Sequence, residues 1–244
     1  MKQALVASWR LLRLVPHVLH GLWLVRRRFE LLTAAEKHQL IQWWSLKTLA
    51  ILGIELKAAG AALPDGHLLV ANHVSWLDIA AVHAVLPQAR FVSKSDVRHW
   101  PLVGALVEGA GTLFIERSSK RDALRVVHQT AAALRAGDCV AVFPEGTTGA
   151  GPALLPFHAN LLQAAVSTEA PVLPVVLRWH EPGERFSSAA QFIGDTTLAQ
   201  SLWRIASARG LGIDLQILST VTPDGRDRRA LGDSLRETIS LRLG

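Results

Sequence analysis

Residues 67–78 read HLLVANHVSWLD, and this stretch indicates the fold class most directly. Its first five residues, His67–Ala71, form a short apolar run that is typical of a fully buried strand. Asn72 and His73 follow it, and an apolar helical pattern then covers Trp76–Leu86. A buried strand, a polar turn and a helix in this order predict one unit of a parallel sheet, with the turn at the carboxyl end of the strand.

The same alternation continues along the chain. Short apolar runs predict strands, and a 3.6-residue periodicity predicts the helices between them. The further strands are expected at Arg90–Ser93, Thr112–Ile115, Asp138–Phe143, Val172–Trp179 and Ile213–Val221. The further helices are expected at Pro101–Val107, Lys120–Ala136, Phe157–Thr168, Leu198–Ala208 and Arg226–Leu243. This pattern predicts an α/β fold with a largely parallel central sheet flanked by helices.

The composition limits the function classes. Half of the 244 residues are hydrophobic and 19% are charged, which excludes a disordered chain. The net charge of +6 lies in residues 1–60, which hold nine Lys and Arg against three Asp and Glu. Residues 61–244 are neutral overall, so no nucleic-acid partner is expected. The single cysteine, Cys139, excludes an intrachain disulfide and a cysteine-based zinc site, no metal is expected, and a reducing, cytoplasm-facing compartment fits best.

A stretch of small residues, Pro and Gly at Ala58–Gly66 is the only obvious boundary. It predicts an N-terminal helical segment over residues 1–57 and a main domain over residues 58–244. The part of the main domain that carries motifs covers about residues 67–180.

The N-terminal segment combines apolar helices with basic residues. Residues 4–25 are apolar, but two arginines, two histidines and Pro16 interrupt them, and charges inside a membrane span are costly. A second helix is expected over residues 33–53, where Thr33 and Glu36 form a capping-box pattern. The segment holds four of the eight tryptophans. We expect a helical hairpin lying on an anionic membrane surface; a helical pair packed onto the core and a true membrane span are the alternatives.

The first polar turn carries a candidate base. An imidazole at a strand end can accept a proton near neutral pH, and a carboxylate that orients it strengthens this role. His73 and Asp78 can meet if His73 lies in the turn and Asp78 lies in the first turn of the helix. The alternative is a capping box from Ser75 to Asp78 with a loop histidine beside it.

Two further strand ends carry charged residues. Glu116-Arg117 follows one strand, Lys94 ends another, and a guanidinium there can bind a phosphate or a carboxylate. Pro144-Glu145-Gly146 follows a third strand, and Glu145 could hold a substrate hydroxyl or pair with Arg117. The alternatives are a surface ion pair and an ordinary turn with a solvated glutamate.

Together these segments resemble the glycerophospholipid acyltransferase family, the PlsC-like 1-acyl-glycerol-3-phosphate acyltransferases. The family carries four sequence blocks in a fixed order: Asn-His-x4-Asp, Gly-x-x-Phe-Ile-x-Arg, Phe-Pro-Glu-Gly-Thr, and an apolar run around prolines. Here they stand at Asn72–Asp78, Gly111–Arg117, Phe143–Thr147 and Ala170–Val175.

The resemblance implies a role for each of these residues. His73 is expected to be the general base, with Asp78 supporting it. The acceptor is expected to contact Asn72, Lys94, Arg117, Glu145, Gly146 and Thr147. The acyl side is expected to be lined by Pro171, Val172, Leu173 and Pro174.

The resemblance also implies the reaction and its partners. A fatty acyl group passes from acyl-CoA or acyl-carrier protein to the free hydroxyl of a lysophospholipid in the membrane, giving phosphatidic acid when the acceptor is 1-acyl-glycerol-3-phosphate. No metal or organic cofactor and no acyl-enzyme are implied, and the expected location is the inner membrane with the catalytic domain facing the cytoplasm.

One residue departs from the family pattern. The third block often continues with an arginine, and Thr148 stands there. The loss of a cation leaves open another lyso-lipid acceptor, such as lyso-ornithine lipid. A hydrolase and a non-catalytic lipid-binding protein on the same scaffold are alternatives of other classes.

Overall fold

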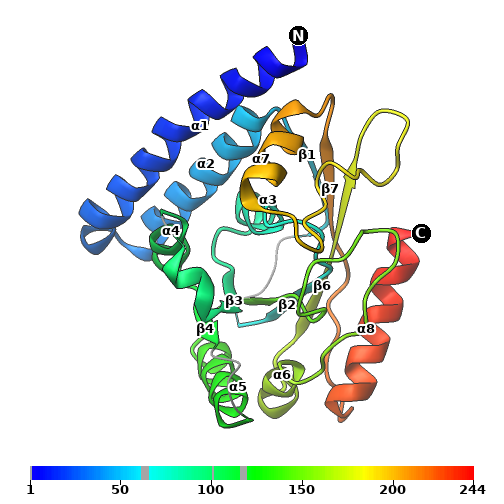
Figure 1. Cartoon of the computed structure of the whole chain (residues 1–244). Coiled ribbons are helices and arrows are strands. Elements are labelled where there is room, and N and C mark those ends of the chain that lie inside the picture. The colour runs from blue at the N-terminus through cyan, green and yellow to red at the C-terminus, as the bar shows by residue number, and fades with distance from the viewer. Residues whose placement is uncertain (1, 62–65, 101, 116–119) are drawn as a thin grey trace.

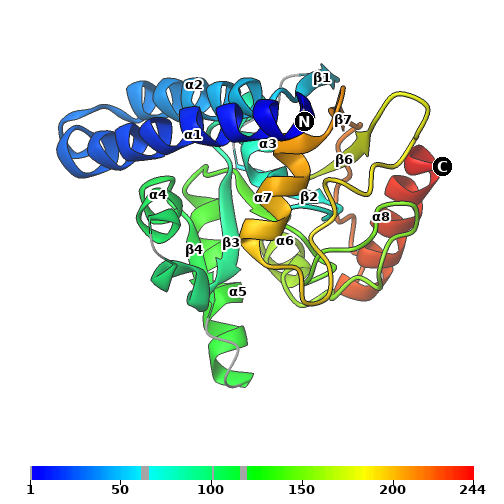
Figure 2. The same ribbon diagram turned by 45° about the horizontal axis from the view of Figure 1, so that its top comes forward.

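The computed structural model describes residues 2–61, 66–100, 102–115 and 120–244. In these residues a seven-stranded sheet has the order β1-β7-β6-β2-β5-β3-β4, with helices on both faces (Figures 1 and 2). The strands are β1 Glu55–Ala59, β2 Leu68–Ala71, β3 Arg90–Lys94, β4 Leu113–Ile115, β5 Val140–Val142, β6 Val172–His180 and β7 Gly212–Ile217. The α-helices are α1 Lys2–Arg27, α2 Ala34–Leu52, α3 Asp78–Val85, α4 Val103–Gly109, α5 Lys120–Arg135, α6 Leu162–Thr168, α7 Leu198–Ser207 and α8 Arg228–Leu243. Two 3-10 helices, η1 Phe29–Leu31 and η2 Ser95–His99, follow α1 and β3.

The sheet is largely parallel, as the sequence predicts. Strand β2 pairs in parallel with β5 and β6, and β3 pairs in parallel with β5 and β4. Strand β7 runs antiparallel to β6, and β1 is parallel to β7. The carboxyl ends of β2, β3, β4, β5 and β6 therefore meet at one edge of the sheet, where sites form in such folds.

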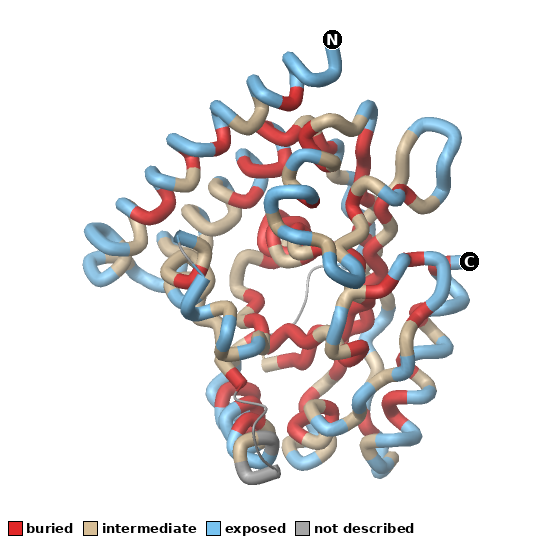
Figure 3. The backbone as a smooth tube through the Cα atoms, viewed as in Figure 1, coloured by how far each residue is buried: buried red, intermediate tan, exposed pale blue. Residues whose placement is uncertain are grey.

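Each face of the central strands buries its own apolar cluster. Along β2, Leu69 and Ala71 face the cluster under α2, α3 and α7, whereas Leu68 and Val70 face the cluster under α5, α6 and α8. This alternation follows the two-residue period of a strand, and it explains why the whole strand is apolar. In Figure 3 the buried segments, drawn in red, are concentrated at the centre of the molecule.

Three elements differ from the sequence prediction. Strand β1 was not expected, because Glu55–Ala59 is exposed along most of its length and lacks an apolar run. It crosses the expected boundary between residues 57 and 58 and joins the sheet through β7. Helix α6 begins only at Leu162; a turn precedes it, and the His158 N–H donates to the Pro144 carbonyl at 2.8 Å instead of entering a helix. Strand β7 ends at Ile217 rather than at residue 221.

Helices α1 and α2 lie side by side and antiparallel (Figures 1 and 2). The capping box of Thr33 and Glu36 forms as predicted at the start of α2. His17 on α1 donates from Nε2 to the Trp44 carbonyl on α2 at 3.0 Å. Among the described residues, no helix has both the length and the apolar character needed to cross a membrane.

Arg10 fixes α1 to the domain. Its guanidinium donates to the carbonyls of Ala206 and Ala208 at the end of α7, at 2.9 and 3.1 Å. The free carbonyls at a helix C-terminus favour a cation, so this contact stabilises both helices. Burial lowers the pKa of Arg10. The guanidinium also covers Gly53, where a Cβ would collide with it.

We expect Arg10→Met to lower the free energy of unfolding by about 1–3 kcal/mol, because it removes two charge-assisted hydrogen bonds and leaves the carbonyls unpaired. Chemical denaturation in mild detergent measures this loss, and hydrogen exchange should show faster exchange along α1. Arg13→Met is the matched control, because Arg13 lies exposed on the same helix. Equal losses in the two variants would contradict this role for Arg10.

Candidate active site

His73 and Asp78 meet at the carboxyl end of β2, as the sequence predicts. Asp78 is the first residue of α3 and has no exposed surface. Its Oδ2 accepts the Nδ1–H of His73 at 2.8 Å. The same oxygen accepts the backbone N–H groups of Val74 at 2.7 Å and Ser75 at 2.9 Å. The turn therefore wraps around the carboxylate and presents the imidazole to it.

The contacts define the tautomer of His73. An ionised carboxylate only accepts hydrogen bonds, so Nδ1 carries a proton, and in the neutral imidazole the lone pair is then on Nε2. No residue in the described ranges bonds to Nε2. The ring stacks on Phe143 with 3.9 Å between ring centres, and 18% of the side-chain surface is exposed. The arrangement can take a proton from a hydroxyl group that approaches Nε2.

Glu145 holds the backbone of His73. The carboxylate is buried, its Oε1 accepts the His73 N–H at 2.7 Å, and its Oε2 accepts the Leu155 N–H at 2.8 Å. Burial raises the pKa of Glu145, against the opposing effect of these two hydrogen bonds. Both oxygens of Glu145 thus fix the backbone of the site, and its predicted contact with the acceptor stays a prediction.

The rest of the third block forms a tight turn. Gly146 has a φ of 71°, in the region that only glycine enters freely, and its N–H donates to the Phe143 carbonyl at 3.0 Å. Thr147 is exposed beside it. The Gly149 N–H donates to the His73 carbonyl at 2.7 Å. The peptide groups on both sides of His73 are thus held by the turn over residues 145–149.

Asn72 has a structural contact. Its side chain is buried, and it bonds in both directions with the backbone of Leu177, accepting its N–H and donating to its carbonyl, each at 2.8 Å. The amide extends the pairing of β2 with β6 by one further step. The predicted contact of Asn72 with the acceptor stays a prediction.

The proline-containing run lies at the start of β6. Val172 and Leu173 have no exposed surface and face the two opposite core clusters, and Pro174 is buried. Val172 pairs with Leu68 at the start of β2, whereas His73 follows the end of that strand. The expected acyl-side role of residues 171–174 stays a prediction.

The structure describes one of the two cations that were predicted to bind the acceptor. Lys94 ends β3 and is exposed at the same edge of the sheet as His73. Arg117 and Glu116 lie outside the described residues.

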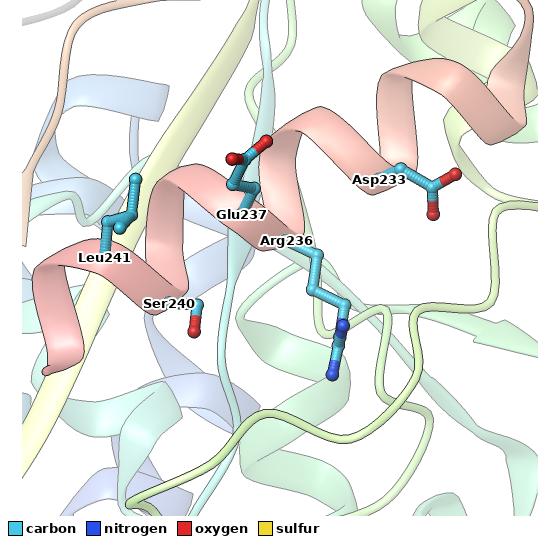
Figure 4. Close-up of a pocket in the computed structure, with 5 residues that line it drawn as sticks. All are labelled: Asp233, Arg236, Glu237, Ser240 and Leu241. Carbon is cyan, nitrogen blue, oxygen red and sulfur yellow. The ribbon is translucent and has the colours of Figure 1, made fainter.

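The pocket in Figure 4 lies on α8 and is lined by Asp233, Arg236, Glu237, Ser240 and Leu241. None of the residues predicted to carry chemistry lines it. Within the described residues, no group of three or more His, Cys, Asp and Glu side chains could hold a metal ion.

Sequence reasoning gave no role to Trp179, whose side chain bonds to the Asp78 carboxylate. The indole Nε1–H of Trp179 on β6 donates to Oδ1 of Asp78 at 2.6 Å. The available signal was a tryptophan in an otherwise aliphatic buried strand, because a buried indole N–H requires an acceptor.

Comparison with known proteins identifies the class. The family model described as "Acyltransferase" matches residues 58–178. The chain is 39% identical over 190 residues to a 1-acyl-sn-glycerol-3-phosphate acyltransferase of Neisseria gonorrhoeae, a match that covers 77% of this chain and 73% of that protein. It is 37% identical over 207 residues to a lyso-ornithine lipid O-acyltransferase of Pseudomonas aeruginosa, covering 85% of this chain and 79% of that protein.

The fold has a close counterpart among solved structures. The crystal structure of the acyltransferase PlsC from Thermotoga maritima superposes with a TM-score of 0.76 at 21% identity, covering 99% of this chain and 95% of that one. The family match and the relatives define the chain as an acyltransferase. It belongs to the PlsC family of O-acyltransferases.

We expect Glu145→Gln to lower the free energy of unfolding by about 1–3 kcal/mol, because the amide places a donor against one of two backbone N–H donors. The raised pKa of Glu145 gives this difference a pH dependence. The folded protein holds the proton more tightly than the unfolded chain, so wild-type stability falls as the pH rises above the ordinary range of a glutamate. The difference in free energy of unfolding between the wild type and Glu145→Gln should therefore decrease as the pH rises above the ordinary pKa range of a glutamate.

Urea denaturation at several pH values measures this difference. Glu237→Gln, at an exposed position on α8, is the control and should show no comparable trend. An advantage that widens with rising pH would contradict the raised pKa.

Proposed function

We propose that this protein transfers a fatty acyl group from acyl-CoA or acyl-carrier protein to the 2-hydroxyl of 1-acyl-glycerol-3-phosphate, giving phosphatidic acid. The observation that carries the proposal is the bonded pair of His73 and Asp78, with a lone pair on Nε2. Two relatives from Neisseria are named 1-acyl-sn-glycerol-3-phosphate acyltransferases, which supports this acceptor.

In the proposed reaction, the acceptor hydroxyl gives its proton to Nε2 of His73 while its oxygen attacks the thioester carbonyl carbon. Asp78 stabilises the positive charge that develops on the imidazole. The tetrahedral intermediate collapses, the carbon–sulfur bond breaks, and the leaving thiolate takes the proton from the imidazolium. The ester and a free thiol result, with no acyl-enzyme and with no metal or organic cofactor in the sequence of steps.

The acceptor phosphate is proposed to bind the cations at the sheet edge. Lys94 stands exposed at the end of β3, and Arg117 belongs to the second sequence block. Gly146 and Thr147 form the turn nearest to the backbone of His73, and we propose that the acceptor passes beside this turn.

A second acceptor is favoured by one position. Thr148 replaces the arginine of the family pattern, and its hydroxyl donates to the carbonyl of Phe192. A headgroup that needs less positive charge, such as the zwitterionic ornithine of lyso-ornithine lipid, fits this substitution. The relative from Pseudomonas aeruginosa carries that activity in its name.

We also propose that α1 rests on an anionic membrane surface at the cytoplasmic face of the inner membrane. One stripe of the helix consists of Leu5, Trp9, Leu12, Leu19 and Trp23, which are 51–69% exposed. Arg26 and Arg27 end the helix, and Arg28 follows them. Exposed tryptophan and leucine with a basic end are typical of a helix that lies in the interface.

We expect Leu12→Glu to reduce binding to vesicles of phosphatidylcholine and phosphatidylglycerol by roughly tenfold or more. The variant places a charge where the exposed leucine would enter the membrane interface. Co-sedimentation with the vesicles measures the change. Leu241→Glu is the control, because Leu241 is 74% exposed on α8. Equal binding of the two variants would refute the membrane role of the α1 stripe.

We expect His73→Ala to lower kcat by at least ~100-fold, the usual contribution of a general base. Thiol release from acyl-CoA in detergent micelles measures the rate, with lysophosphatidic acid, with lyso-ornithine lipid and without acceptor. His128→Ala, at an exposed position on α5, should keep the wild-type rate. A near-wild-type rate for His73→Ala would remove the mechanism.

The same assay separates the acceptors. Faster release with lysophosphatidic acid supports the first acceptor, and faster release with lyso-ornithine lipid supports the second. If the thiol is released as fast without any acceptor as with one, this would contradict acyl transfer to a lipid and would indicate hydrolysis of acyl-CoA.

A further inference from the structure

The two oxygens of the Asp78 carboxylate have different partners. Oδ2 accepts three N–H groups, from His73, Val74 and Ser75. Among the described residues, Oδ1 accepts only the indole N–H of Trp179, at 2.6 Å. One side of the carboxylate thus faces the base, and the other side is held by a residue 101 positions further along the chain.

The sheet places this indole. Ala71 pairs with Val175, and the Asn72 amide then bonds to the backbone of Leu177. Side chains two residues apart share a face of a strand, so Trp179 lies on the same face as Leu177. That face packs under α3, where Asp78 begins the helix.

The indole is as deeply buried as the carboxylate. Trp179 is 2% exposed, and Asp78 is fully buried. Water therefore cannot replace the N–H if it is lost. Without it, a charged oxygen would remain unsatisfied in the interior, and the carboxylate could relieve this cost by rotating about the Cβ–Cγ bond. Such a rotation would move Oδ2 away from Nδ1 of His73.

We propose that Trp179 is a positioning residue for acyl transfer, which holds Oδ1 of Asp78 so that Oδ2 stays aligned with His73. The proposal rests on the proposed role of His73 as the general base. Trp179 does not touch the substrate; it acts through Asp78. If Oδ2 moves away from Nδ1, the imidazolium loses the carboxylate that stabilises it, so loss of the indole N–H should make the imidazole harder to protonate.

The test compares two tryptophans that each donate one hydrogen bond. Trp76 Nε1–H donates to the Ser201 hydroxyl at 3.1 Å and does not contact Asp78. We expect Trp179→Phe to lower kcat by about tenfold or more with little change in KM for either substrate. The acid limb of its pH–rate profile should move to lower pH, because the imidazolium is less well stabilised. Trp76→Phe should keep the acid limb of the wild type.

Trp179→Phe also removes volume from the core, so a second variant isolates the N–H. Replacement of Trp179 by 3-benzothienylalanine keeps the shape of the indole and exchanges only the N–H for sulfur. The same fall in kcat and the same displaced acid limb are expected. A wild-type kcat and acid limb in this variant would overturn the proposal.

The outcome for His73→Ala keeps the two hypotheses apart. If His73→Ala retains activity, the base assignment fails, and the role of Trp179 fails with it. If His73→Ala is inactive while the benzothienyl variant behaves as wild type, only the role of Trp179 fails.

Discussion

The buried charge of Asp78 is the constraint on which the site depends. A carboxylate without exposed surface is costly unless several hydrogen bonds compensate it. Here two chain segments supply N–H groups: the turn after β2, through two backbone N–H groups and the imidazole of His73, and β6, through the indole of Trp179. The turn can provide two backbone donors only if it curls around the start of α3. The shape of the turn and the orientation of the base are therefore tied to one buried carboxylate.

A second buried carboxylate acts on the same histidine in a different way. Asp78 binds the His73 side chain, whereas Glu145 binds its backbone N–H and connects it to Leu155. Burial raises the pKa of Glu145, so the hydrogen bonds only partly repay the loss of water around it. Such a costly group is consistent with a need to fix the backbone at the base more firmly than an ordinary turn would. The first and third sequence blocks are thus parts of one scaffold, and they meet because β2 and β5 are neighbours in the sheet.

The sequence predicts the sheet and the catalytic pair because both follow from local patterns. Apolar runs define the buried strands, and the five-residue spacing from His73 to Asp78 fits a turn followed by a helix. The backbone contacts of Asn72 and Glu145 were not predicted, because a motif letter does not tell whether a side chain also holds the backbone. Strand β1 was missed because its exposed residues carry no apolar pattern, and only its pairing with β7 makes it a strand. Contacts such as Trp179 with Asp78 depend on register between distant strands, which no local pattern contains.

Position 148 shows how one substitution changes two properties of the site together. The Thr148 hydroxyl donates to the Phe192 carbonyl, and the Phe192 N–H donates to the Val74 carbonyl at 3.0 Å. The segment after β6 is thereby tied to the turn that carries His73. An arginine at position 148 would supply a cation, but its guanidinium, several bonds further from the backbone, could not make the short hydroxyl contact. With threonine at position 148, the chain lacks that positive charge and gains a hydrogen bond that holds the segment around Phe192 against the turn that carries His73. Under the proposed reaction, recognition of an acceptor phosphate then depends on other cations. The same residue therefore affects both the charge offered to the acceptor and the position of the Phe192 segment.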